Sequence, residues 1–268
     1  MEIIERIDDW RASFERWSRG QGTASDEVGN DYPYVENKRA PFQPARSALS
    51  MLNLAVISSA GAYVDGAKPF DVTNNDDVTI REIPREIEGE DLRYAARGYD
   101  ASAVTADMNS LIPIQRLLEF QNNGIIGQLN QVWWSFSGFI PDAAKIAESL
   151  TPKLIERVKR YEVQAALLIP ASRLCHQSIA LVARALELER IPTMMLAVER
   201  KIVDRVRPPR AGVYKGEFGS VAGKANFAEH QRRVLDEALR LIEPIDQPTI
   251  RQLTVVLESE VESSRGER

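Results

Sequence analysis

The stretch that decides the fold is residues 165–191, AALLIPASRLCHQSIALVARALELERI. It begins with five apolar residues, a run typical of a buried strand, and Pro170 ends that run. A short polar loop follows, and an amphipathic helix is predicted to begin close to Cys175, the only cysteine, with His176 beside it. In an open α/β sheet, ligands bind in the crevice beyond the carboxyl ends of the strands. A thiol at a helix start also meets the positive end of the helix dipole, which favours the thiolate, so we expect a reactive group at this junction.

The composition of the chain excludes several classes of protein. Its 268 residues are 44% hydrophobic, enough to bury a core in one large domain or two small lobes. A formal net charge of -5 argues against a nucleic-acid partner, which needs a basic face. The basic cluster at residues 200–210 is a local exception, but Pro208 and Pro209 interrupt it, so a solvated connector is favoured over a phosphate site. One cysteine excludes an intrachain disulfide, and with two histidines it makes no metal site by spacing.

The sequence also argues against a membrane location. The N-terminus is charged and amphipathic and lacks the basic and apolar regions of a signal peptide. No apolar run approaches the roughly 20 residues that span a bilayer. A lone cysteine suits a reducing compartment, so we expect a cytoplasmic protein with no membrane partner.

Hydrophobic periodicity divides the chain into three parts. Residues 1–45 are predicted to form an amphipathic helix (2–19) and an extended arm, and residues 249–268 a C-terminal helix with a charged tail. Residues 46–248 alternate strands with helices, which predicts an α/β domain of one or two lobes, with a mostly parallel sheet flanked by helices in right-handed βαβ units. Strands are predicted at 52–58, 79–83, 92–94, 132–136, 165–169 and 193–198, and helices at 112–121, 153–161, from near 175 to 189, and 226–243.

The first helix carries an aromatic stripe that includes Trp10, Phe14 and Trp17. This pattern fits a helix that packs on its own domain, and it also fits a contact between subunits. Both interpretations stay open at the level of sequence.

The residues of the 165–191 junction also allow two interpretations. Cys175 is either a small buried hydrophobic residue or a nucleophile, since unpaired cysteines are among the most buried residues. Its place near Ser172 and His176 supports the nucleophile. Because His176 follows Cys175 directly, on a helix it points about 100° away and is no automatic general base. His230, in the last predicted helix, is expected to be a surface histidine without a function.

Two further segments carry groups that suit a site. Asp100, Asp107 and Asn109 precede a predicted helix, where helix capping is the alternative to ligand binding. Arg116 lies early in that helix, where the dipole disfavours a cation, so a carboxylate partner or an anionic ligand is expected. Residues 212–223 hold four glycines but lack the pattern of a phosphate-binding loop, and a flexible loop over a site is predicted.

Short motifs along the chain carry a further signal. They are Ser59-Ala60-Gly61, Pro69-Phe70-Asp71, Asp77, Arg81-Glu82-Ile83-Pro84, Tyr99-Asp100, Asp107-Met108-Asn109, Pro113, Arg116-Leu117, Cys175-His176, Ile191-Pro192, Pro209-Arg210 and Gln231. In their order and spacing they resemble the selenoprotein B family of the glycine, sarcosine, betaine and D-proline reductases, most closely its smaller, D-proline-reductase-like members. The resemblance covers most of residues 52–243 and rests on no single decisive motif.

The resemblance implies a subunit of an oligomeric reductase that breaks a C–N bond at the α-carbon of a small amino acid or amine. In the family a selenocysteine or cysteine attacks that carbon, and a second thiol resolves the adduct. For this chain the resemblance implies a catalytic loop with Cys175 as nucleophile, together with Ser172 and His176. The substrate-binding residues that it implies are Ser59, Asp100, Asp107, Asn109 and Arg116. No cofactor is expected on this chain itself, since in the D-proline enzymes a pyruvoyl group on a partner chain activates the amine.

The chain departs from the family pattern at the redox loop. The family spaces its reactive residues three apart, at positions that match Ser172, Cys175 and Ser178, and here only Cys175 is a thiol. A histidine expected shortly before Tyr99 is replaced by Ala96. Reduction by two thiols of this chain is therefore excluded, and an external thiol reductant is expected to resolve an adduct on Cys175.

Two other functions stay open. In the first, the chain is a catalytically inert binding or scaffolding subunit, and Cys175 behaves as an ordinary buried thiol. In the second, the fold serves a non-redox lyase or hydrolase that uses Ser172 or an acidic residue. No Ser–His–Asp arrangement is visible in the sequence to support this second function.

Overall fold

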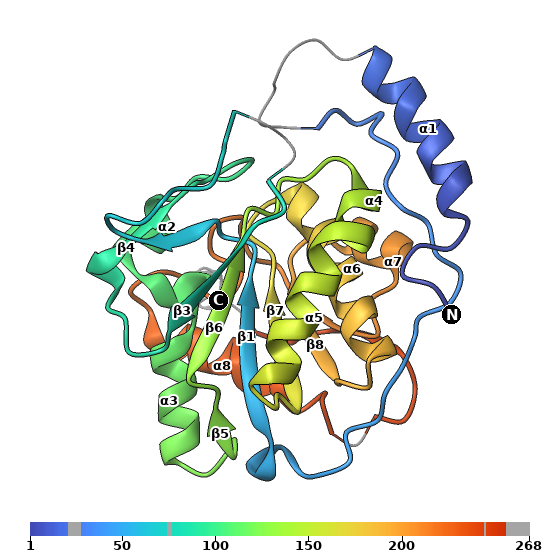
Figure 1. The fold of residues 1–268 in the computed structure, drawn as a ribbon. Helices are drawn as coiled ribbons and strands as arrows, with labels where there is room; N and C mark the ends of the chain where they lie inside the picture. The colour runs from blue at the N-terminus through green and yellow to red at the C-terminus, as the bar shows by residue number, and fades with distance from the viewer. Residues whose placement is uncertain (21–27, 74–76, 244, 256–268) are drawn as a thin grey trace, which may run out of the picture.

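The computed structural model describes residues 1–20, 28–73, 77–243 and 245–255. Within these residues, a mostly parallel sheet of eight strands forms the centre of the fold, in the order β10-β9-β8-β7-β1-β6-β3 with β5 paired to β1 (Figure 1). Only β3 among these strands runs antiparallel to its neighbour. The strands are β1 (Asn53–Ser58), β3 (Ile80–Pro84), β5 (Gln128–Leu129), β6 (Val132–Phe136), β7 (Ala165–Ile169), β8 (Thr193–Ala197), β9 (Arg210–Val213) and β10 (Thr249–Gln252). A separate antiparallel pair consists of β2 (Ala62–Val64) and β4 (Leu92–Tyr94).

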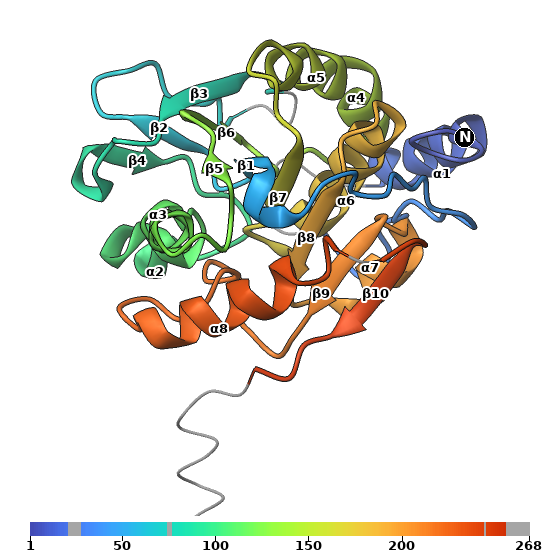
Figure 2. The ribbon, with the colours of Figure 1, turned by 90° about the horizontal axis from the view of Figure 1, so that it is seen from below.

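Helices cover both faces of the sheet (Figure 2). One layer holds α4 (Ala143–Lys145), its π-helical continuation η4 (Ile146–Leu150), α5 (Thr151–Arg160), α6 (Arg173–Leu188) and α7 (Arg200–Val206), with α1 (Ile7–Arg19) outside them. The other layer holds α2 (Ser102–Ala106), η3 (Met108–Ser110), α3 (Ile114–Asn122) and α8 (Ala228–Leu239). Short 3₁₀ turns are η1 (Leu49–Met51) and η2 (Gly89–Asp91). The predicted α/β architecture with an N-terminal helix is confirmed.

The two layers have separate cores because strand side chains alternate between faces. In β1, Leu54 and Val56 enter the core under α3 and α8, whereas Ala55 and Ile57 enter the core under α5 and α6. All four are fully buried. A strand buried on both faces reads as a continuous apolar run, and for this reason β1 and β7 could be predicted from sequence.

The strand order of the sheet has a topological switch point between β1 and β7. After β1 the chain moves to β6 on one side, and it then crosses back to β7 on the other side. β1 and β7 end together, with Ser58 opposite Ile169, and the Ser59 N–H donates to the Ile169 carbonyl at 3.1 Å. Such a reversal opens a crevice at the carboxyl ends of the two strands, so Ser59 and the loop before α6 flank the expected ligand position.

Helix α6 is buried on almost every side because the N-terminal arm, residues 28–48, lies across it. Arg184 is fully buried and donates to backbone carbonyls of Glu2, Ile3, Arg39 and Arg207. One turn on, Glu187 forms a fully buried ion pair of 2.6 Å with Arg210 of β9. Glu187 accepts the Gln43 N–H of the arm, and Arg210 donates to the Gln43 carbonyl at 2.7 Å. We call this set of contacts the arm clamp; it gives each buried charge partners on the arm.

Two predicted helices have wrong boundaries for local reasons. The first helix begins at Ile7 instead of residue 2, because Arg6 is left-handed (φ 55) and the Glu5 carboxylate binds the backbone N–H groups of Lys38 and Arg39. The last long helix covers Ala228–Leu239 instead of 226–243, with Asn226 left-handed at φ 57.

The C-terminal part also differs from the prediction. Residues 249–252 form β10 at one end of the main sheet instead of a helix, so the sheet extends past the predicted boundary at residue 248. The predicted charged tail lies in residues 256–268, outside the described residues. None of the described helices is both long and apolar enough to cross a membrane.

The aromatic stripe of α1 packs on its own chain. Trp10 and Phe14 stack at 5.0 Å, and Trp17 meets Tyr32 of the arm edge-to-face at 5.0 Å. The Trp10 indole N–H donates to the Pro33 carbonyl at 2.7 Å. The interpretation as intramolecular packing therefore holds for the side chains on this stripe.

Candidate functional site

The thiol of Cys175 lies at the base of the crevice, in the first turn of α6. Ser172 is the N-cap of this helix: its Oγ accepts the Cys175 N–H at 3.2 Å, and its hydroxyl donates to Sγ at 2.9 Å. The Cys175 S–H is directed to the Ser59 carbonyl at 3.9 Å. Gly138 closes the other side, because a Cβ on Gly138 would lie 2.6 Å from Sγ. Cys175 is only 1% exposed, so Ser59, Gly138 and Ser172 enclose a thiol that a cap residue positions.

His176, the neighbour of Cys175, is fully occupied by backbone contacts. Its Nδ1 lies 2.7 Å from the Ser172 carbonyl, and its Nε2 accepts the Val198 N–H at 3.0 Å, so Nδ1 carries the proton. Burial lowers the pKa of His176 to about 4. A neutral imidazole in this place joins the loop before α6 to the loop after β8, and neither nitrogen is free to act as a base on the thiol.

A cavity of about 180 Å³ opens over the first turn of α6. It is lined by Val28, Gly98, Phe139, Ser172, Arg173, Leu174 and Phe218. This volume is well below the 300–1,000 Å³ typical of pockets for drug-sized ligands, so it suits a molecule of a few heavy atoms. The start of α6 directs partial positive charge into it, which favours a ligand with an anionic group. Ser172 connects the cavity with the buried thiol, because it lines the cavity and its hydroxyl donates to Cys175 Sγ.

Phe218 of the glycine-rich loop after β9 lines this cavity, and the backbone of this loop, predicted to be flexible, is held by hydrogen bonds at several points. The Gly219 N–H donates to the Ala171 carbonyl at 2.8 Å, and the Ala222 N–H to the Ser110 carbonyl at 2.7 Å. Gly219 has φ +78, and a Cβ there would lie 2.5 Å from the Asp100 carbonyl oxygen. These contacts hold Phe218 at the cavity, with its ring edge-to-face on His176 at 5.7 Å.

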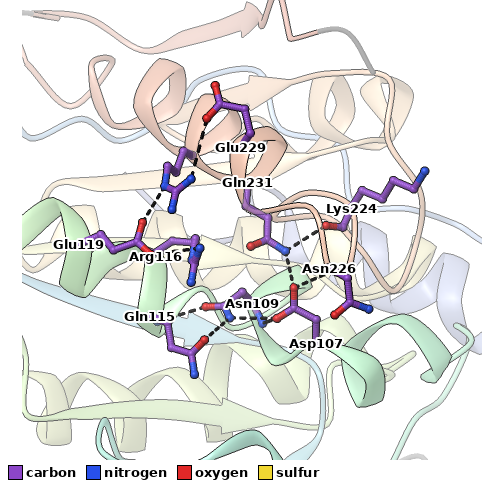
Figure 3. A network of polar contacts seen from close by, with 10 residues as sticks. Asp107, Asn109, Gln115, Arg116, Glu119, Lys224, Asn226, Glu229 and Gln231 are labelled. Carbon is purple, nitrogen blue, oxygen red and sulfur yellow. Dashed lines mark hydrogen bonds and ion pairs between the residues drawn. The ribbon is translucent and has the colours of Figure 1, made fainter. Parts of the chain in front are cut away.

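Asp107 and Asn109 form a second polar cluster (Figure 3), and neither residue lines the cavity. Asp107 caps η3 and accepts four hydrogen bonds, from the Asn109 N–H and Nδ2, the Asn226 N–H and Gln231 Nε2. Asn109 also bonds the side chain and the N–H of Gln115. Partial burial raises the pKa of Asp107, but the hydrogen bonds from Gln231, Asn109 and Asn226 outweigh it, so the pKa is lowered. We call this cluster the Asp107 network; it ties η3 and α3 to the start of α8.

The remaining predicted site residues have local partners. Arg116 binds Glu119 at 3.0 Å, and Glu119 binds Arg232 at 2.7 Å, which supplies the carboxylate partner expected for Arg116. The Asp100 carboxylate bonds the N–H and hydroxyl of Ser102 at the surface. Ser59 Oγ accepts the Ala171 N–H at 3.0 Å.

The structure therefore brings together only part of the predicted site. The residues that meet at the crevice are Ser59, Ser172, Cys175 and His176, whereas Asp107, Asn109 and Arg116 do not line the cavity. A role of these last three in substrate binding stays a prediction, and the structure gives them partners within the fold. The predicted surface position of His230 is wrong: the residue is 4% exposed, its Nδ1 accepts the Lys224 N–H at 3.0 Å, and its ring stacks on Phe227.

Sequence reasoning missed the two aromatic walls of the cavity. Phe139 follows β6 and Phe218 follows β9, so both stand beyond the carboxyl end of a strand, where the general rule for such sheets expects ligand contacts. The positions of Phe139 and Phe218 beyond the ends of strands could therefore have identified them as cavity residues. Among the described residues, no group of three or more His, Cys, Asp or Glu is placed to hold a metal ion.

Comparison with known proteins defines the class. The model of the glycine/sarcosine/betaine reductase selenoprotein B family matches residues 23–171, more than half of the chain, so the chain belongs to that family. The matched region ends one residue before Ser172. The D-proline reductase subunit gamma of Acetoanaerobium sticklandii is 28% identical over 199 residues, which cover 74% of this chain and 81% of that protein.

Two longer relatives match over a smaller share of their length. The sarcosine reductase complex component B subunit beta of Peptoclostridium acidaminophilum is 25% identical over 202 residues, 70% of this chain and 45% of that protein. The glycine reductase complex component B subunit gamma of Symbiobacterium thermophilum is 24% identical over 174 residues, 61% of this chain and 39% of that protein. This chain thus spans less than half the length of either protein. No solved structure matches the chain.

Proposed function

We propose that this chain is a subunit of a reductase complex that binds a small amino acid or amine in the crevice cavity and uses Cys175 to break its C–N bond. The observation that carries the proposal is the position of Ser172, which lines the cavity and donates to Cys175 Sγ at 2.9 Å. Family membership supports it, because the relatives are named as subunits of D-proline, glycine and sarcosine reductases. The partial positive charge at the start of α6 suits the carboxylate of an amino acid.

The chemistry needs thiols from outside this chain. The Cys175 thiolate forms an S–C bond as the C–N bond breaks, and the nitrogen leaves as an amine that takes a proton. An external thiolate then attacks Sγ, the S–C bond breaks, and its electron pair and a proton make the new C–H bond. Cys175 is left in a mixed disulfide, which a second external thiol reduces. The substrate gains two electrons and two thiols become a disulfide. Activation of the amine is assigned to a pyruvoyl group on a partner chain.

The enclosed thiol supports a second candidate function. Cys175 is 1% exposed, and each contact that encloses it also stabilises the fold. A binding or scaffolding subunit needs the cavity but not the thiol. In the first function, by contrast, the substrate or a partner chain must displace Ser172 or the segment at Gly138 before Sγ can attack.

One experiment separates the two functions. The chain is purified with its partner subunits, and amine release from candidate substrates is measured for the wild type, Cys175→Ala and Cys175→Ser. The proposal expects both variants to lose at least about a thousandfold in turnover, as removal of a nucleophile does. Unchanged turnover would rule out the nucleophile and favour the binding subunit. Iodoacetamide labelling against pH reports the same thiol directly, since the chain has no other cysteine, and Cys175→Ala is the blank.

A further inference from the structure

A second cavity lies at the edge of the sheet opposite to the crevice. It opens where β9 and β10 begin, and these strands run parallel to β7 and β8, so their starts lie far from the carboxyl ends that form the crevice. Its volume is about 510 Å³, within the range typical of sites for small organic molecules. Its lining residues are Met1, Lys38, Arg39, Ala40, Arg207, Pro208, Pro248, Thr249 and Ile250. We call this cavity the basic groove.

The groove is basic although the chain is acidic. Three of the lining residues just named are cations and none of them is acidic, whereas the whole chain has a net charge of -5. Within the described part of the chain, the exposed side chains of Lys38, Arg39 and Arg207 form no ion pair. By contrast, Arg210 at the start of β9 pairs with Glu187 at 2.6 Å. The groove therefore holds positive charge that has not been used inside the described fold.

One buried side chain fixes the backbone that carries two of these cations. Arg184 is fully buried, and its Nη1 donates to the Arg39 carbonyl at 2.7 Å and to the Arg207 carbonyl at 2.9 Å. On the arm, the N–H groups of Lys38 and Arg39 donate to the Glu5 carboxylate at 2.9 and 3.0 Å. The three cations therefore extend from a main chain that is already in place, so that a ligand need not order it on binding.

The charge of the groove suits a dianion. Glu5 is the acidic residue under the arm, and its carboxylate also lies 4.0 Å from the buried guanidinium of Arg184. Even if the whole charge of Glu5 is counted against the groove, three cations and one carboxylate leave two positive charges. A phosphate monoester carries a charge of about -1.5 to -2 at pH 7, which matches this surplus. The fork of an arginine guanidinium also fits the oxygens of a phosphate group.

The other side chains of the groove favour a ligand with an organic body. Ala40, Pro208, Pro248 and Ile250 supply apolar surface beside the cations. An inorganic phosphate ion would use the cations alone and leave most of the 510 Å³ to water. A ligand that also covers the apolar side chains gains from their removal from water.

We propose that the basic groove binds an organic phosphate of about the size of a mononucleotide, with its phosphate on Lys38, Arg39 and Arg207 and its organic body on the apolar lining. The ligand joins the arm, the end of α7 and the start of β10, which are distant in sequence, so its binding stabilises the arm on the domain. Nothing in this proposal depends on the function proposed for Cys175.

Calorimetric titration of the full chain tests the site, with AMP, inorganic phosphate and adenosine as probes. AMP is expected to bind with a dissociation constant of roughly 100 μM and at least about tenfold more tightly than either other probe, because it alone offers both charge and an organic body. Bound AMP is expected to slow hydrogen exchange at the amides of residues 38–40 and 249–251. Raised salt is expected to weaken the binding.

A charge variant and a matched control locate the site. Lys38→Gln/Arg207→Gln is expected to weaken AMP binding about thirtyfold, the effect of two charge-assisted hydrogen bonds of ordinary strength. Lys153→Gln/Arg190→Gln removes the same charges at exposed positions outside the groove lining and is expected to bind AMP as the wild type does. Urea unfolding confirms that both variants are folded.

Three results would overturn the proposal. They are absence of AMP binding at millimolar concentration, binding of inorganic phosphate as tight as that of AMP, and an equal loss of binding in the control variant. Amine release by the complex is expected to be the same in the groove variant as in the wild type, so failure of this proposal is distinguishable from failure of the function proposed for Cys175.

Discussion

The crevice and the Asp107 network are two polar regions beside helix starts, and the fold uses them differently. In the network, the Asp107 carboxylate accepts four hydrogen bonds, and the Asn109 side chain uses both its carbonyl oxygen and its NH₂ group. The hydrogen-bonding groups of these side chains are therefore satisfied within the fold. At the crevice, Ser172 bonds Cys175 and still lines a cavity. The difference teaches that polar residues before a helix indicate a site only where their partners leave room for a ligand. Three predictions probe this contrast.

Asp107→Ala is expected to have the largest effect on stability. It removes an acceptor of four hydrogen bonds and leaves the Gln231 amide with only its bond to the Lys224 carbonyl, so we expect a loss of about 3 kcal/mol in the free energy of unfolding. Urea unfolding measures it, with Asp100→Ala as the control, since Asp100 bonds only its own turn. Ligand binding at the crevice should be retained. A stable Asp107→Ala protein that no longer binds substrate would instead place Asp107 in the site.

The pH dependence of stability is expected to report on His176. Its pKa is lowered by burial from 6.5 to about 4, so the folded state takes up the proton less readily than the unfolded state. The resulting stabilisation is complete above pH 6.5 and is lost as pH falls toward 4, by about 3 kcal/mol in total.

In His176→Gln this part of the slope should vanish, which unfolding at a series of pH values measures. His230 and Glu187 titrate in both proteins with slopes of opposite sign, because the pKa of His230 is lowered and burial raises that of Glu187 to about 7, so the difference between wild type and variant reports on His176. An unchanged slope would contradict the neutral, backbone-bound imidazole.

Ser172→Ala is expected to have the smallest effect on stability and a clear effect on the thiol. Loss of the N-cap costs about 1 kcal/mol, and loss of the hydroxyl uncovers Sγ on the cavity side. Iodoacetamide should therefore label Cys175 faster than in the wild type, whereas Ser172→Thr, which keeps the hydroxyl, should label slowly. Equal labelling rates in all three proteins would mean that Ser172 does not separate the cavity from the thiol.

Much of the fold could be predicted because its signals are local. β1 and β7 are apolar runs buried on both faces, and the junction at Ser172 combines a strand end, a cap residue and a helix. β9 and β10 were missed because four-residue strands such as RAGV and TIRQ carry too little pattern. Their pairing, not their composition, makes them strands.

The site could be predicted only in part, because its walls come from distant segments. The contact of Phe218 with His176 depends on the loop after β9, which Gly219 and Ala171 hold in place. One of the hydrogen-bond donors to Asp107 is Gln231, which lies 124 residues further along the chain. A sequence shows that Asp107 is polar and near a helix start, but it does not show which remote donors will satisfy it.

The arm clamp also orders events during synthesis. The Gln43 backbone is held by Glu187 and Arg210, and the bond to Arg210 spans 167 residues. The first 45 residues leave the ribosome long before these partners exist, so they cannot take their final place until β9 has been made. The arm therefore completes its contacts only after β9 has been made. A chain that stops before Arg210 would leave Glu187 in α6 without its buried ion-pair partner and the Gln43 carbonyl of the arm without its donor.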